Sequence, residues 1–121
     1  MIAIKSLHEI EKMKVAGRIA GAALREAGRA VRPGITTAEL DEIVRSCIEA
    51  EGATPTFLGY GGFPASACVS VNEQVIHGIP SRKTVLREGD SFHCCGGCPK
   101  SVTNTGTIVT KMLVTLLPPQ A

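Results

Sequence analysis

The sequence of 121 residues predicts one small α+β domain, in which two helices pack on an antiparallel sheet or hairpin. Three observations support this fold class. Two stretches in the first fifty residues repeat apolar residues at helical spacing, each behind a capping signal. A glycine-rich turn then occupies positions 59–64, and a short run with alternating polarity follows at 66–71.

The first predicted helix begins behind Ser6 and Glu9, which have the spacing of a capping box. An apolar face recurs behind them at intervals of three and four residues. Its members are Leu7, Ile10, Met13, Ala16, Ala20, Ala23, Leu24 and Ala27. This spacing predicts one buried face along a long amphipathic helix, which Arg32-Pro33-Gly34 ends.

The second predicted helix begins at a second capping box, formed by Thr36 and Glu39. Its apolar stripe predicts packing on the same core as the first helix, and Gly52 marks its end. The stripe consists of Leu40, Ile43, Val44, Cys47 and Ile48.

The segment Phe57 to Pro80 carries the features most suggestive of a site. Its glycines at 59, 61 and 62 permit positive φ angles and a close approach of the backbone to a ligand. Ser66–Val71 reads as a strand, Asn72-Glu73 as a turn, and Gln74–His77 as the returning strand of a hairpin. We expect this hairpin to hold His77 at a strand end beside an aromatic, glycine-lined opening.

Composition excludes several classes of function. A net charge of +2 predicts no nucleic-acid partner and no membrane partner. The apolar run 108–117 contains Lys111 and is too short to span a bilayer. No secretory signal precedes the first helix, so the five cysteines are expected to be reduced thiols in a cytoplasmic protein.

Taken together, several motifs resemble the methionine aminopeptidases of the short bacterial type. These motifs are Gly59-Tyr60-Gly61-Gly62-Phe63-Pro64, Ser70-Val71-Asn72-Glu73, His77-Gly78-Ile79-Pro80, and Leu86 with Glu88-Gly89-Asp90. The resemblance runs from about residue 4 to Asp90. It implies the N-terminal half of the pita-bread fold of metallopeptidase family M24.

The resemblance also implies a function and site residues. Such enzymes remove the initiator methionine from nascent proteins when the next residue is small, so N-terminal methionyl peptides are the expected partners. His77 matches the histidine that contacts the substrate beside the scissile peptide and stabilises developing charge. Phe57, Tyr60, Phe63 and Cys68 match positions that line the pocket for the methionine side chain.

The family uses two divalent metal ions (cobalt, manganese, iron or zinc) held by carboxylates and one histidine. By resemblance, all five ligands lie beyond the point of divergence, so no ligand set is expected in this chain. Glu73, Glu88 and Asp90 match no ligand position, and Asp90 reads as a turn residue. We therefore expect a fragment that is inactive by itself.

The composition changes abruptly after Asp90. All eleven acidic residues lie in 1–90, whereas 91–121 holds none of them and three of the five cysteines. We interpret 1–90 as the aminopeptidase-like half and 91–121 as a divergent tail, frameshifted or disordered, and we expect no family strand to follow Asp90.

Two other functions remain open from the residues alone. The chain could be a non-catalytic module that binds methionyl peptides or a partner. It could also be a small zinc protein that binds metal through His93, Cys94, Cys95 and Cys98. A lone half of the fold would expose apolar surface, which predicts self-association.

Overall fold

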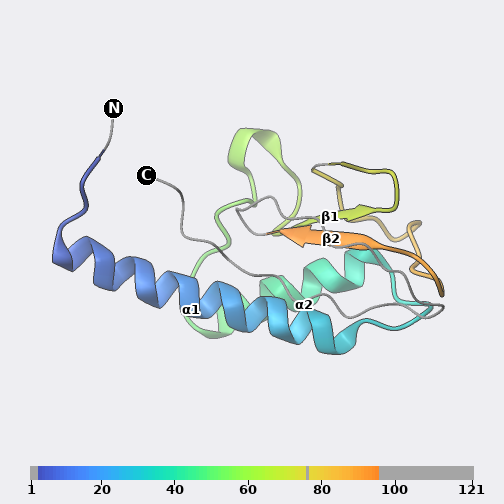
Figure 1. Ribbon diagram of the computed structural model, residues 1–121, viewed down its shortest axis with the longest axis horizontal. Coiled ribbons are helices and arrows are strands. Elements are labelled where there is room, and N and C mark those ends of the chain that lie inside the picture. The colour runs from blue at the N-terminus through green and yellow to red at the C-terminus, as the bar shows by residue number, and fades with distance from the viewer. Residues whose placement is uncertain (1–2, 76, 96–121) are drawn as a thin grey trace.

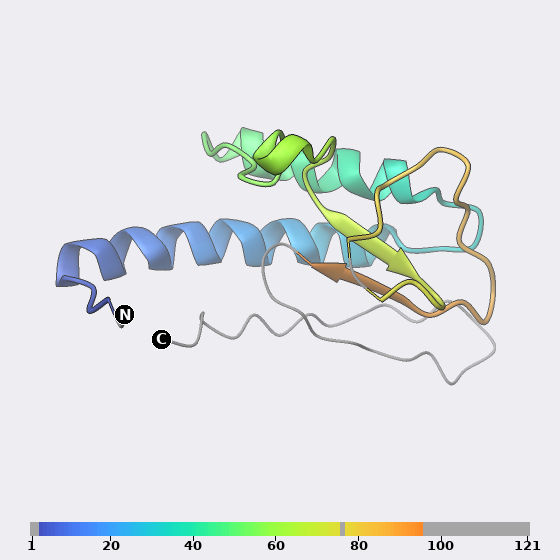
Figure 2. The same ribbon diagram turned by 90° about the horizontal axis from the view of Figure 1, so that it is seen from above.

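The computed structural model describes residues 3–75 and 77–95. Within this part of the chain, two helices lie on one side of a two-stranded antiparallel sheet (Figures 1 and 2). The elements are α1 (Leu7–Ala30), α2 (Thr37–Ala50), the short 3-10 helix η1 (Tyr60–Gly62), β1 (Cys68–Val71) and β2 (Phe92–Cys95). The predicted α+β class is confirmed. Neither described helix combines the length and apolar character that crossing a bilayer requires.

Helix α1 begins at its predicted capping box. The backbone N–H of Ser6 donates to Glu9 Oε2 at 2.7 Å, and the backbone N–H of Glu9 donates to Ser6 Oγ at 3.3 Å. The hydroxyl of Ser6 also donates to Glu9 Oε2 at 2.8 Å, and the backbone and hydroxyl hydrogen bonds that the Glu9 carboxylate accepts from Ser6 lower its pKa. The helix ends at Ala30, before Pro33, as the sequence predicts.

Only the second half of the predicted apolar face of α1 is buried. Ala23 and Ala27 are in the core, whereas Leu7 is 83% exposed and Met13 is 42% exposed. The reason is length: α1 extends about 36 Å and α2 only about 21 Å. The remaining elements cover the C-terminal part of α1, and its first turns project beyond them (Figure 1). The prediction of one continuous buried face is therefore wrong for the first half.

Helix α2 is fixed at its N-terminus by the chain that precedes β2. The capping box of Thr36 and Glu39 forms as predicted. The hydroxyl of Thr37 donates to Ser81 O at 3.1 Å and accepts from the backbone N–H of Ser81 at 2.9 Å. An isolated antiparallel bridge between Thr36 and Val85 continues this contact. Residues 81–86 therefore hold the linker between the helices.

The core lies between the helices and one face of the sheet. Val69 and Val71 of β1, together with Phe92 and Cys94 of β2, pack there with Leu40 of α2. Side chains alternate between the two faces of a strand, so Cys68, Ser70 and His93 belong to the other face. The sheet consequently has an inner, helix-covered face and an outer face.

The pairing of β1 corrects two expectations. Residues 74, 75 and 77 form no strand, so the predicted hairpin through Gln74–His77 is wrong. The partner of β1 is β2, with Val71 opposite Phe92 and Cys68 opposite Cys95. A strand therefore does follow Asp90, because Phe92 and Cys94 alternate as the buried apolar pair that this edge of the core requires. Residues 96–121 of the expected tail lie outside the described residues.

The predicted turn at Asp90 is confirmed. Its hydrogen bonds link the end of β1 to the residues directly before β2. Asp90 accepts the backbone N–H of Arg87 at 2.8 Å and the side-chain amide of Asn72 at 3.0 Å. Asn72 also donates its backbone N–H to Ser91 O at 2.7 Å and accepts the N–H of Ser91 at 3.1 Å. Asn72 adopts a left-handed φ of 52° to do so.

Candidate functional site

His77 lies at an exposed corner of the chain and has an unusual backbone conformation. Its φ of 55° falls in the left-handed region, which residues other than glycine seldom adopt. Such conformations are maintained by surrounding contacts and concentrate at functional sites. Among the described residues with side chains, only Asn72 shares this property.

The corner is held against β1 by main-chain contacts of Gly78. The backbone N–H of Val69 donates to Gly78 O at 2.8 Å, and the N–H of Gly78 donates to the buried Ser70 Oγ at 3.1 Å. A Cβ atom at position 78 would lie 2.2 Å from Val69 O. Only glycine fits there, so the backbone next to His77 is fixed closely on the strand.

Cys68 of β1 lies beneath the imidazole of His77. The Cys68 Sγ atom is 3.6 Å from His77 Nδ1. Cys68 is 3% exposed, whereas His77 is an exposed residue. One nitrogen of the imidazole therefore contacts a buried sulfur at the outer face of the sheet.

The glycine-rich segment forms the predicted turn. Gly59, Gly61 and Gly62 all have positive φ angles, and η1 returns the chain so that the N–H of Gly59 donates to Phe63 O at 2.8 Å. This turn brings Phe57 and Phe63 together, edge to face, with ring centroids 6.2 Å apart.

The structure thus brings Phe57 to Phe63 and Cys68 to His77. It leaves Tyr60 of η1 with 80% of its surface exposed. That all five residues surround one methionine pocket stays a prediction.

Asp41 of α2 also positions this region, and sequence reasoning missed it. Its Oδ1 atom accepts the backbone N–H of Ser66 at 2.8 Å and of Ala67 at 2.7 Å, directly before β1. Burial raises the pKa of Asp41, although these two hydrogen bonds oppose the shift. The only sequence feature that could have indicated this role is the position of the Asp41 carboxylate, directly after Leu40 of the buried stripe.

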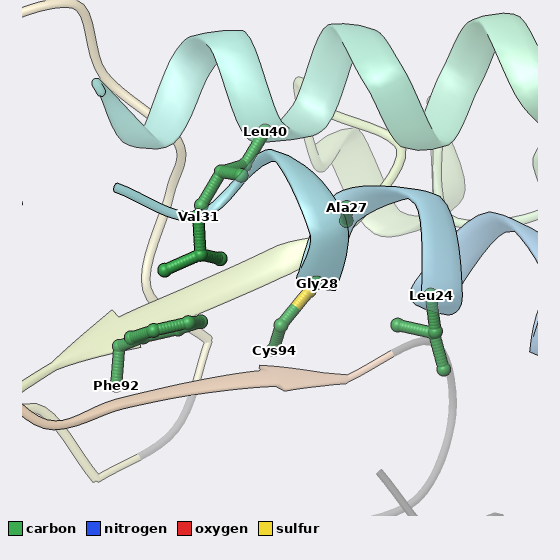
Figure 3. A pocket seen from close by; sticks show the side chains of 7 residues that line it. All are labelled: Leu24, Ala27, Gly28, Val31, Leu40, Phe92 and Cys94. Carbon is green, nitrogen blue, oxygen red and sulfur yellow. The ribbon is translucent and has the colours of Figure 1, made fainter. Parts of the chain in front are cut away.

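The structure describes the alternative zinc site only in part, through His93 and Cys94. His93 and Cys94 are neighbours in β2, so their side chains point to opposite faces of the sheet. Cys94 points toward α1 in a small apolar pocket between the helices and β2 (Figure 3). The pocket is lined by Leu24, Ala27, Gly28, Val31, Leu40, Phe92 and Cys94.

His93 lies on the other face of β2, and burial lowers its pKa. In this arrangement His93 and Cys94 face opposite sides of the sheet. Cys98 and the Cys95 side chain lie outside the described part of the chain.

The resemblance to the aminopeptidases implies two metal ions, which carboxylates and one histidine would hold. In 3–75 and 77–95, no three His, Cys, Asp or Glu side chains form a group that could hold an ion. The described residues therefore do not fit a two-metal centre.

Comparisons with known proteins agree on one family. Residues 11–110 match metallopeptidase family M24. The methionine aminopeptidase of Clostridium acetobutylicum is 54% identical over 90 residues, which cover 74% of this chain and 36% of that protein. Methionine aminopeptidase 2 of Mycobacterium tuberculosis is 58% identical over 81 residues, which cover 67% of this chain and 28% of that protein.

Solved structures give the same result for the fold. The crystal structure of the methionine aminopeptidase of Thermotoga maritima matches 78% of this chain and 38% of its own length, with a TM-score of 0.76 and 42% identity. The two helices and the two-stranded sheet thus correspond to part of the pita-bread fold.

This chain spans about a third of the length of the curated relatives. The family match itself extends 20 residues beyond Asp90, from 91 to 110. The chain therefore belongs to metallopeptidase family M24, as a homologue of part of the methionine aminopeptidases.

Proposed function

We propose that this chain contributes the methionyl-peptide site of a methionine aminopeptidase, a hydrolase that removes the initiator methionine from nascent proteins. Phe57, Tyr60, Phe63 and Cys68 form part of the pocket for the methionine side chain, and His77 contacts the adjoining peptide. Residues 1–90 carry this aminopeptidase-like portion, whereas 91–121 form the divergent part.

The corner at His77 is the observation that supports this proposal most directly. A left-handed histidine is held by Gly78, which no other residue can replace without a clash. Fixing an imidazole at an exposed position beforehand lowers the ordering cost of binding a peptide group. A histidine kept only for packing would be expected to be buried, and His77 is exposed.

The binding experiment is a titration of the chain with a Met-Gly-type tripeptide, measured by isothermal titration calorimetry. His77→Ala should weaken binding by about fivefold, because a hydrogen bond to the peptide contributes about 1 kcal/mol. His8→Ala is the matched control, since His8 lies on the exposed first turns of α1, and it should bind as the wild type does. Wild-type chain that binds no peptide, or an equal loss in both variants, would contradict the proposed site.

The catalytic experiment separates a peptide-binding module from an enzyme. The described residues do not fit two metal ions. We therefore expect no hydrolysis of the same tripeptide by this chain alone, with cobalt, manganese, iron(II) or zinc added. Turnover that disappears in His77→Ala would show that the chain is an active peptidase and would overturn this expectation.

A further inference from the structure

The outer face of β1 presents two side chains to the corner that carries His77. Cys68 and Ser70 are two residues apart and share this face, because side chains alternate along a strand. Ser70 Oγ accepts the N–H of Gly78 at 3.1 Å, and Cys68 Sγ lies 3.6 Å from His77 Nδ1. The serine therefore fixes the backbone of the corner while the cysteine contacts its side chain.

Hydrogen-bond chemistry decides the direction of the contact between sulfur and nitrogen. A neutral imidazole has one nitrogen that donates and one that accepts, and the contact of one nitrogen sets the proton on the other. A thiol is a weak acceptor, whereas an unprotonated imidazole nitrogen is a good one. The favourable arrangement is Sγ–H donating to Nδ1, which leaves the imidazole proton on Nε2.

We propose that Cys68 is a positioning residue that holds the His77 imidazole in its Nε2–H tautomer and fixes the orientation of the ring. The hydrogen bonds of Gly78 to Val69 and Ser70 hold the corner on β1, and the absence of a Cβ atom at position 78 permits this close approach. With the backbone fixed, the remaining freedom of His77 is rotation of its side chain, and the thiol restricts that rotation.

The consequence for function rests on the function proposed above. Negative charge that develops on a peptide oxygen is stabilised by a hydrogen-bond donor. The Nδ1–H tautomer of His77 would instead present an unprotonated Nε2, whose lone pair repels that charge. Nε2–H supplies such a donor. Cys68 would then influence substrate chemistry through His77, in addition to any contact with a methionine side chain.

The test reads the imidazole directly, without peptide or metal, so its result is independent of the proposed function. Chain labelled with ¹⁵N-histidine is examined by NMR at about pH 8, where an ordinary imidazole is neutral. We expect His77 to show a protonated Nε2 and an unprotonated, hydrogen-bonded Nδ1. Cys68→Ala should move the Nδ1 resonance of His77, and Cys68→Ser, which restores a donor, should return it part of the way.

Two controls accompany the experiment. Cys47→Ala removes a thiol from α2 and should leave His77 unchanged, and His8 provides an internal reference in every sample. A wild-type His77 with its proton on Nδ1 would overturn the proposal. So would a folded Cys68→Ala chain whose His77 resonances match the wild type.

A second measurement decides the matter if Cys68→Ala does not fold. The infrared S–H stretching band of a donating thiol lies at lower wavenumber than that of a non-donating one. In the difference spectrum between the wild type and His77→Ala, one S–H band should move to higher wavenumber in the variant. An unchanged S–H region would overturn the proposal.

Discussion

Ser66 and Ser70 lie four residues apart, are both buried, and have opposite hydrogen-bonding states. Ser70 Oγ accepts the N–H of Gly78, whereas Ser66 Oγ has no hydrogen-bond partner among the described residues. A buried polar group without a partner destabilises a fold, and so does the removal of a partner from a buried group.

We predict opposite effects when each serine is replaced by alanine. Ser70→Ala leaves the N–H of Gly78 buried and unsatisfied, and should lower the free energy of unfolding by about 1–3 kcal/mol. Ser66→Ala removes an unsatisfied hydroxyl and should raise it by about 1 kcal/mol. Urea unfolding followed by circular dichroism measures both, and changes of the same sign in the two variants would contradict this reading.

At the same scale, sequence identifies residue types better than their conformations. The motif around His77 predicts a special position, but the left-handed backbone depends on Val69 and Ser70 holding Gly78 from eight or nine residues away. The contact between Cys68 and His77 depends on that same corner. Neither follows from local spacing, so the sequence indicates the participants and not their geometry.

At the scale of elements, the sequence predicts the starts of the helices, which depend on neighbouring residues. It does not predict the pairing of β1 with β2, which are distant in the chain. Both helix N-termini follow from capping boxes whose partners are three residues apart. The partner of β1 lies more than twenty residues downstream, and the intervening turn at Asn72 misleadingly suggests a short hairpin. The change in composition after Asp90 also hid β2, whose apolar alternation is only four residues long.

The connection between α2 and β1 depends on one carboxylate and gives a prediction about pH. Burial raises the pKa of Asp41 above its ordinary value of 3.8. The folded chain therefore binds this proton more tightly than the unfolded chain does. The contribution of Asp41 to stability is consequently complete below pH 3.8 and is lost as the pH rises through the raised pKa.

Asp41→Asn should remove that dependence, because an amide retains the acceptor oxygen but does not titrate. We expect the free energy of unfolding of the wild type, measured in urea and expressed relative to that of Asp41→Asn, to decrease between about pH 3.5 and pH 7. Glu42→Gln, at the exposed neighbouring position, should preserve the wild-type profile. A wild type that gains stability relative to Asp41→Asn as the pH rises would mean that the hydrogen bonds from Ser66 and Ala67, and not burial, control the pKa of Asp41.

At the scale of the whole molecule, the first half of α1 presents an exposed apolar surface. Leu7, Ile10 and Met13 of the helix, and Ile4 before it, are all at least 36% exposed. Helical periodicity predicts which residues share a face, but not how far the rest of the chain extends along the helix. The short α2 decides that extent, and the periodicity within α1 carries no sign of it.

This surface leads us to expect self-association of the chain. The sedimentation coefficient of the wild type should rise with concentration, and Leu7→Glu combined with Met13→Lys should abolish the rise. Val75→Lys changes an equally exposed apolar residue away from α1 and should sediment as the wild type does. A wild-type chain that sediments as a monomer at every concentration would exclude this expectation.

Gly78 limits how this site can be altered by mutation. Its missing side chain is what lets two stretches of backbone touch, so any replacement separates the histidine corner from its supporting strand. Efforts to change the specificity of the site must therefore substitute the side chains around that corner, because no other residue fits at position 78.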